Sequence, residues 1–165
     1  MEDLPSVQIA ELTDKPSMQV LVKNILVAIP AGLAATGVMT IVMLLAPIIG
    51  IPEVNLPRLI GTLLGMSLSV GLLLHFTLGI GVAILFAVGF TGRSMAPTWL
   101  QGLLYSVAVW LFLMLVAGPV GGWGLFASHT ASPSGVLLTS LLGHLAFGTT
   151  MGLIYEKAAL RLWSA

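Results

Sequence analysis

Two histidines are the residues of this sequence with the clearest potential for a chemical or binding role. His75 and His144 lie within long hydrophobic stretches, each among small residues that recur every four positions. An ionisable residue inside a membrane span is costly, which makes it a functional candidate by default. Neutral imidazole can donate one hydrogen bond and accept one. The structural alternative is that each ring bonds a backbone carbonyl or a nearby hydroxyl, with Thr77, Ser140 and Thr149 as the available hydroxyls.

The functional alternative is that His75 and His144 bind haem b as a pair of axial ligands. His144 lies 12 residues before Glu156 and His75 lies 18 residues before Arg93. At 1.5 Å per helical residue, the two imidazoles would differ in depth by about 9 Å, which disfavours a shared iron. We therefore expect no cofactor, with haem b as the alternative. No metal site is expected either, because only His129 offers a third imidazole.

Helices must position these histidines, and the spacing of small residues indicates how. Residues four apart share one face of a helix, and small side chains there let two membrane helices approach closely. We expect the small-residue faces of the two histidine helices to pack against each other and to bring both imidazoles into the interior. The predicted helix-packing residues are Gly71, Gly79 and Ala83 beside His75, Gly148 and Gly152 beside His144, and Gly32 and Thr36 in the first hydrophobic segment.

The composition is that of an integral membrane protein. Of 165 residues, 58% are hydrophobic and 7% are charged, and the mean hydropathy is +1.08. Six basic residues balance six acidic ones, so no net charge favours nucleic acid as a partner. The chain has no cysteine, which excludes thiolate chemistry. Neither a nucleophile–base pair nor paired carboxylates are evident in the sequence, and we expect no enzymatic activity.

The fold class predicted is all-α: an integral membrane four-helix bundle. A polar N-terminal tail covers residues 1–20, and a transmembrane domain covers residues 21–165. Each predicted span is long enough to cross a hydrocarbon core of roughly 30 Å. The spans are expected at about 24–49, 67–90, 98–117 and 134–155, with a short interfacial segment at 55–65.

The distribution of basic residues predicts the orientation. Lys15, Lys23, Arg93, Lys157 and Arg161 fall on one side of a four-span arrangement, and only Arg58 falls on the other. By the positive-inside rule both termini are cytoplasmic. We therefore expect a multi-pass protein of the bacterial inner membrane.

An internal repeat is a further hypothesis. The stretch LLLHFTLGIGVAILF at 72–86 aligns without gaps to LLGHLAFGTTMGLIY at 141–155, which matches His75 with His144 and Gly79 with Gly148. A duplication would make the bundle two related helical hairpins. The similarity between the first and third spans is weak.

The run HxxxGxxxGxxY, formed by His144, Gly148, Gly152 and Tyr155, resembles small uncharacterised four-span bacterial inner-membrane proteins of the YagU-like group. His75 and Gly79 on the second span, and GLAATGVMTIVML at 32–44, are similar in style. The resemblance implies a four-helix bundle and a role as an accessory membrane component.

The function expected from these features is that of a non-catalytic accessory subunit of a larger membrane complex, in particular a respiratory or photosynthetic electron-transfer complex. Besides the lipid bilayer, its partners would be other membrane subunits, bound through the bulky third span and the N-terminal tail. The alternative is a haem b-binding or small-solute-conducting membrane protein that uses His75 and His144.

Overall fold

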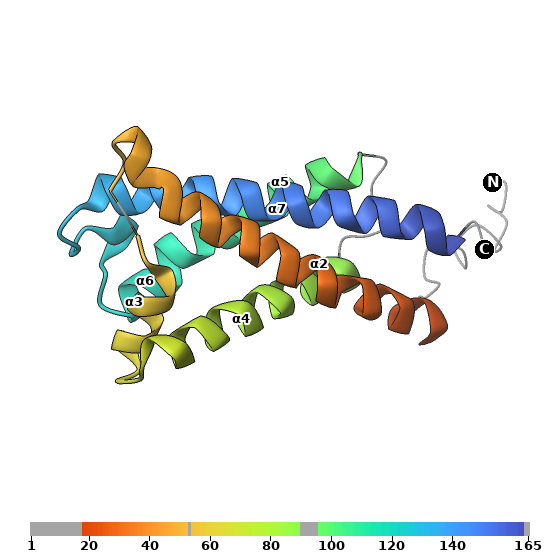
Figure 1. Ribbon diagram of the computed structural model, residues 1–165, viewed down its shortest axis with the longest axis horizontal. Helices are drawn as coiled ribbons and strands as arrows, with labels where there is room; N and C mark the ends of the chain where they lie inside the picture. Colours follow the sequence, from red (N-terminus) through yellow and green to blue (C-terminus); the bar gives the residue numbers. More distant parts are fainter. Residues whose placement is uncertain (1–17, 53, 90–95, 164–165) are drawn as a thin grey trace, which may run out of the picture.

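The protein is a bundle of four long helices (Figure 1). The computed structural model describes residues 18–52, 54–89 and 96–163, and these residues contain no strand. Four helical segments are long and apolar enough to cross a membrane: Met18–Ile49, Leu68–Gly89, Thr98–Val120 and Pro133–Ala158. The all-α prediction is therefore confirmed, and the chain is a multi-pass membrane protein. The long helices are α2 (Met18–Leu45), α4 (Leu68–Gly89), α5 (Thr98–Phe112) and α7 (Pro133–Trp163).

Helix α2 begins at Met18, earlier than the expected start near residue 24, and it includes part of the predicted polar tail. Pro30 lies inside α2 without ending it, as membrane helices tolerate when neighbouring groups satisfy the freed carbonyl. The helix tightens into a 3-10 turn, η1 (Ala46–Ile49), and Gly50 ends it at a φ of 78°. The remainder of the predicted tail, residues 1–17, lies outside the described residues.

The predicted interfacial segment contains a short helix, α3 (Leu56–Leu63). The Asn55 side chain caps it by accepting a hydrogen bond from the Arg58 N–H at 3.0 Å, and Pro57 occupies the first turn. Helix α3 packs on α4 at the end of the bundle opposite the start of α2 (Figure 1).

The third span contains a wider turn at its end. After α5 the chain continues through a π-helical turn, η2 (Leu113–Ala117), and one further helical turn, α6 (Gly118–Val120). The Gly118 N–H donates to the carbonyl of Leu113, five residues earlier. Pro119 explains the widening, because its ring would clash with the carbonyl four residues before it in a regular α-helix. A 3-10 turn, η3 (Leu125–Ala127), precedes α7.

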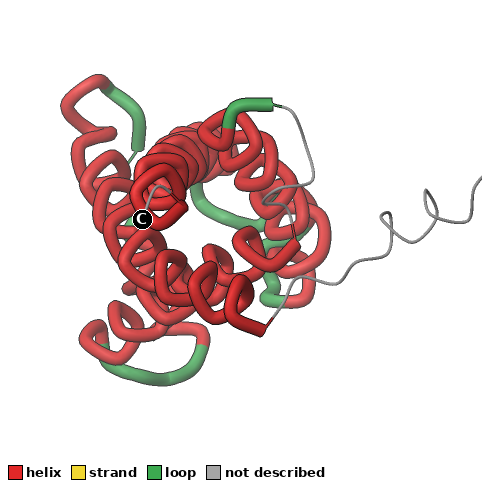
Figure 2. The backbone as a smooth tube through the Cα atoms, turned by 90° about the vertical axis from the view of Figure 1, so that its right-hand side faces the viewer, coloured by secondary structure: helices red, strands yellow, loops and turns green. Residues whose placement is uncertain are grey.

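The helices surround a common centre, as seen end-on in Figure 2. The closely packed pairs are α5 with α7, α2 with α7, α2 with α4, and α3 with α4. Within the described chain, α4 and α7 are not among the closely packed pairs. The prediction that the two histidine helices pack face to face is therefore wrong.

The small-residue face of α4 instead packs on α2, and that of α7 packs on α5. A Cβ atom at Gly79 would collide with the Thr36 hydroxyl on α2, and one at Gly148 would collide with the Ser106 hydroxyl on α5. A Cβ atom at Gly152 would lie 2.6 Å from the Thr98 carbonyl oxygen. These glycines are helix-packing residues, but the sequence did not reveal their partners.

The remaining predicted packing residues also lie at close contacts between helices. A Cβ atom at Gly32 would lie 2.9 Å from the Cβ atom of Ala83, so the backbones of α2 and α4 touch there. Gly71 instead faces α3, where a Cβ atom would collide with the carbonyl of Pro57.

The two hairpins repeat the same close contact. In the first, Gly32 and Thr36 of α2 meet Gly79 of α4; in the second, Gly102 and Ser106 of α5 meet Gly148 of α7. In both hairpins, the first helix has a glycine and, four residues later, a threonine or serine. These two residues contact one glycine of the second helix. The duplication stays a hypothesis, and this shared contact is where the two hairpins correspond in the structure.

These contacts predict opposite results for one substitution at two glycines. Gly148→Ala should lower the free energy of unfolding by about 1–3 kcal/mol, because the new methyl group overlaps α5. Gly81→Ala on α4 meets nothing within 4 Å and should be neutral or stabilising by up to about 1 kcal/mol. Thermal unfolding of both variants in detergent measures the difference, and equal midpoints would contradict this description of the hairpin contact.

Candidate functional site

A cavity of about 330 Å³ lies at the centre of the bundle. Its walls come from all four long helices, from α3 and from the π turn η2, and most of the lining side chains are apolar. Three aromatic side chains line it: Phe112, Trp123 and Phe147. The polar side chains in the wall are Thr36, His75, Ser106, Ser140 and His144.

Both predicted imidazoles lie in this wall. His75 is 5% exposed and His144 is 6% exposed, and they enter the cavity from α4 and α7 respectively. The two histidines therefore share an interior space although their helices do not pack closely together. The third histidine, His129, is exposed in the loop before α7.

A chain of hydrogen bonds fixes His75 against α2. The Thr36 hydroxyl donates to the Gly32 carbonyl and the Thr40 hydroxyl donates to the Thr36 carbonyl, both at 2.7 Å. The Thr40 oxygen lies 3.2 Å from Nε2 of His75. Because the single Thr40 hydrogen is already donated, Nε2 of His75 carries a proton and donates to Thr40.

A second network holds His144. Its Nδ1 lies 2.8 Å from the Ser140 carbonyl oxygen, and a carbonyl only accepts, so Nδ1 carries the proton. The Ser140 hydroxyl donates to the Val136 carbonyl and accepts from the indole N–H of Trp110 at 3.0 Å. The ring is therefore oriented by its own helix, and Trp110 ties that helix to α5.

The structural alternative expected each histidine to bond a carbonyl or hydroxyl across a close helix contact. His75 does bond across to another helix, but to Thr40, which was not among the hydroxyls considered, whereas His144 bonds a backbone carbonyl within its own helix. Sequence reasoning also missed Ser106 and Trp110. One signal was present for Thr40, because it continues the four-residue series of Gly32 and Thr36.

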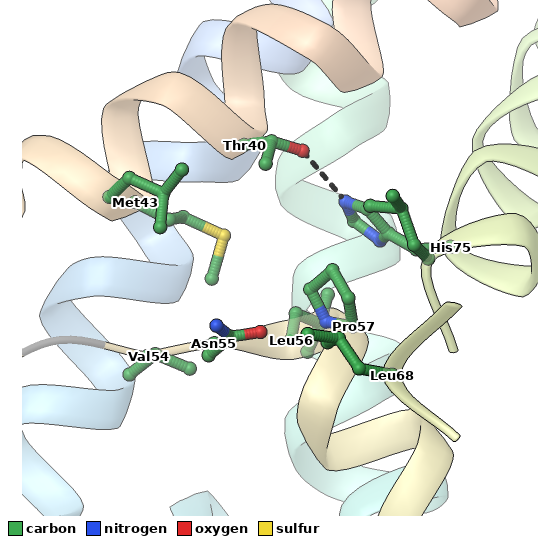
Figure 3. Close-up of a pocket in the computed structure, with 10 residues that line it drawn as sticks. Thr40, Met43, Val54, Asn55, Leu56, Pro57, Leu68 and His75 are labelled. Carbon is green, nitrogen blue, oxygen red and sulfur yellow. Dashed lines mark hydrogen bonds between the residues drawn. The ribbon is translucent and has the colours of Figure 1, made fainter. Parts of the chain in front are cut away.

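His75 also lines a smaller cavity of about 160 Å³ (Figure 3). The smaller cavity lies between the end of α2 and the start of α3, and Thr40, Met43, Asn55 and Pro57 contribute to its wall. The His75 ring lines both cavities, and its bond to Thr40 crosses between α4 and α2 (Figure 3).

Loop contacts close the same end of the bundle. The Thr139 hydroxyl of α7 donates to the Pro52 carbonyl at 2.8 Å, which ties α7 to the chain between α2 and α3. Val54, Leu56, Leu59 and Ile60 then contribute apolar wall to the central cavity. The predicted interfacial segment therefore forms part of the site.

Thr40→Val should remove the hydrogen bond that orients the His75 ring, while the valine keeps the shape of the threonine side chain. We expect a loss of about 0.5–1.5 kcal/mol in the free energy of unfolding and a change in the ¹⁵N resonances of the His75 ring. The control is Thr77→Val on α4, since the Thr77 hydroxyl is exposed and bonds only the carbonyl of Leu73 in its own helix. Unchanged His75 resonances in Thr40→Val would contradict the assigned hydrogen bond.

Comparison with known proteins places the chain in a family without assigning its chemistry. A family model described as a family of unknown function, DUF6789, matches residues 22–161. No curated protein sequence and no solved structure matches the chain. The resemblance to YagU-like proteins stays a prediction. The matched region includes both histidines, both hairpins and the whole central cavity, and the chain belongs to the DUF6789 family of unknown function.

Proposed function

We propose that the protein is a non-catalytic membrane protein that binds a small apolar molecule in the central cavity. The observation that carries this proposal is a cavity of about 330 Å³ with a largely apolar wall and two buried imidazoles. Sites for small molecules are concave and mostly apolar, with a few polar groups that fix orientation. His75 and His144 are the polar groups proposed for this role.

The volume suits a ring with a short substituent. An engineered apolar cavity of roughly 150 Å³ is enough to bind benzene in another protein. The central cavity here is about twice that size. It could therefore hold a substituted aromatic ring or a length of hydrocarbon chain taken from the bilayer.

The hydrogen bonds favour binding over catalysis. In a nucleophile–base pair, the imidazole accepts the proton of a hydroxyl. Here the hydroxyls of Thr40 and Ser140 donate to backbone carbonyls instead. Each histidine also uses one ring nitrogen to hold its own position, which suits a fixed binding wall.

Haem b remains an alternative occupant because both imidazoles line one cavity. The Nε2 atom of His75 could bind iron only after leaving Thr40. A Soret band in the purified protein that is lost in both His75→Ala and His144→Ala would identify it. Conduction of a small solute is less well supported, because the cavity wall offers few polar groups.

A second candidate function is that of an accessory subunit of a respiratory or photosynthetic electron-transfer complex. The third span favours this function. Only 17% of the residues in its apolar stretch are buried within the protein, against 28–44% for the other spans. Another membrane subunit could cover this face. The N-terminal tail, the other proposed contact, lies outside the described residues.

We propose the bacterial inner membrane as the location, with both termini cytoplasmic. Helix α2 begins and α7 ends at the same end of the bundle (Figure 1). Lys23 lies near the start of α2 and Lys157 near the end of α7, whereas Arg58 lies on α3 at the opposite end. The positive-inside rule supports this orientation.

Filling the cavity should prevent binding. Val109 lines the central cavity, and Val109→Phe should reduce the amount of apolar molecule retained by the purified protein about tenfold, as measured by mass spectrometry of organic extracts. Val88→Phe is the control, because Val88 is 42% exposed on α4 and lies outside the cavity. Equal retention by the two variants, or none by the wild-type protein, counts against the proposal.

If another subunit covers the outer face of α5, a larger side chain there should disrupt the complex, whereas a larger side chain on the outer face of α4 should not. Leu104 on α5 and Leu85 on α4 are 61% and 65% exposed. Leu104→Trp should release the chain from a complex that survives in mild detergent, whereas Leu85→Trp should not. Size-exclusion chromatography measures both, and a wild-type protein that is a partnerless monomer under these conditions would rule the proposal out.

A further inference from the structure

We infer that the central cavity selects an aromatic molecule that carries hydroxyl groups, of the hydroquinone class, over the corresponding quinone. This inference rests on the proposed binding function and adds the chemical class of the ligand. It follows from which ring nitrogens of His75 and His144 are already used, and from the side chains that face them.

The first step concerns the unused nitrogen of His75. Nε2 donates to Thr40, so in the neutral ring Nδ1 carries no proton. The described residues provide no hydrogen-bond partner for Nδ1. His75 therefore has one acceptor to offer a ligand.

His144 also has one ring nitrogen that can accept a hydrogen bond, but in its tautomer this nitrogen is Nε2. Nδ1 donates to the Ser140 carbonyl, which leaves Nε2 as an acceptor without a partner among the residues described. Both rings are at least nine-tenths buried, in surroundings that disfavour a charged imidazole. Both rings line the cavity, and each keeps one acceptor nitrogen without a partner among the residues described.

The hydroxyl groups in the wall add no free donor. Thr36 donates to Gly32, Ser106 donates to Leu103 at 2.9 Å, and Ser140 donates to Val136. A ligand that carries only carbonyl oxygens would place lone pairs opposite the imidazole lone pairs. A ligand hydroxyl can instead donate to an imidazole nitrogen.

The apolar part of the wall suits an aromatic ring. Phe112, Trp123 and Phe147 line the cavity together with Met39 and Met114. Aromatic side chains favour stacked or edge-on contact with another ring, and thioether sulfurs also make favourable contacts with aromatic rings. A ring with two hydroxyl groups therefore matches both the shape and the hydrogen-bonding pattern of this cavity.

The discrimination should be large because it depends on buried polar groups. A site built to hydrogen-bond a ligand hydroxyl rejects an analogue that lacks it, since its own polar groups are then left without partners. Replacing each ligand hydroxyl by a methoxy group removes the donor and keeps the ring. This pair of ligands tests the inference without any change to the protein.

The experiment titrates wild-type protein, labelled with ¹⁵N-histidine and purified in detergent, with three probes under anaerobic conditions. The probes are tetramethylhydroquinone, its dimethyl ether and tetramethylbenzoquinone. The hydroquinone should bind about tenfold or more tightly than the other two, and it should shift the acceptor-nitrogen resonances of His75 and His144. His129, which is exposed in a loop, is the internal reference and should not shift.

The outcomes separate this inference from the proposed function. Equal binding of the hydroquinone and its ether, or tighter binding of the quinone, would overturn the selection for hydroxyl donors and leave apolar binding in place. Opposite tautomers in the ¹⁵N spectrum would also overturn it. Failure of all three probes, together with no retained apolar molecule, would remove the proposed function itself.

Discussion

Close backbone approach within each hairpin is the constraint on which the rest of the structure depends. In lipid, helices gain little from burying apolar surface against each other, so packing and interhelical hydrogen bonds must hold them together. Gly32 with Gly79, and Gly102 with Gly148, bring two backbones into contact in each hairpin. A hydroxyl one turn further along, from Thr36 or Ser106, fills the remaining space. The helices cannot separate at these points without leaving empty space in the bundle.

The central cavity follows from this pairing. Because α4 packs on α2 and α7 packs on α5, the glycine faces are used inside the hairpins and are unavailable to close the gap between α4 and α7. The hairpins join mainly through α2 and α7. His75 and His144 border the space that remains, and hydrogen bonds to Thr40 and to the Ser140 carbonyl hold their rings. The same glycines that stabilise the bundle therefore also keep its centre open.

Much of the fold could be predicted from the sequence, because the relevant signals are local. Long apolar segments indicate spans, and Asn55 before Pro57 indicates a helix start, which the structure contains as α3. The partners of the glycine faces could not be predicted in this way. A four-residue series of small side chains shows that something approaches closely, but not which helix does so. The choice between α2 and α7 as the partner of α4 depends on the whole bundle.

The candidate site was predictable only in part. His75 and His144 stand out in the sequence because they are polar groups in apolar segments. The cavity between them depends on side chains from six elements, including the π turn, and no local pattern reveals such a combination. The tautomers likewise depend on Thr40 and on the Ser140 carbonyl, and one of these lies on another helix.

The His75 ring borders both cavities, together with Val54 and Leu56. A hydrogen bond such as the one to Thr40 contributes only about 1 kcal/mol net, so an occupant that offered the ring a new partner could offset its loss. The smaller cavity beside Met43 and Asn55 shares this ring as part of its wall, so a molecule with a tail would have more room near His75 than a bare ring needs.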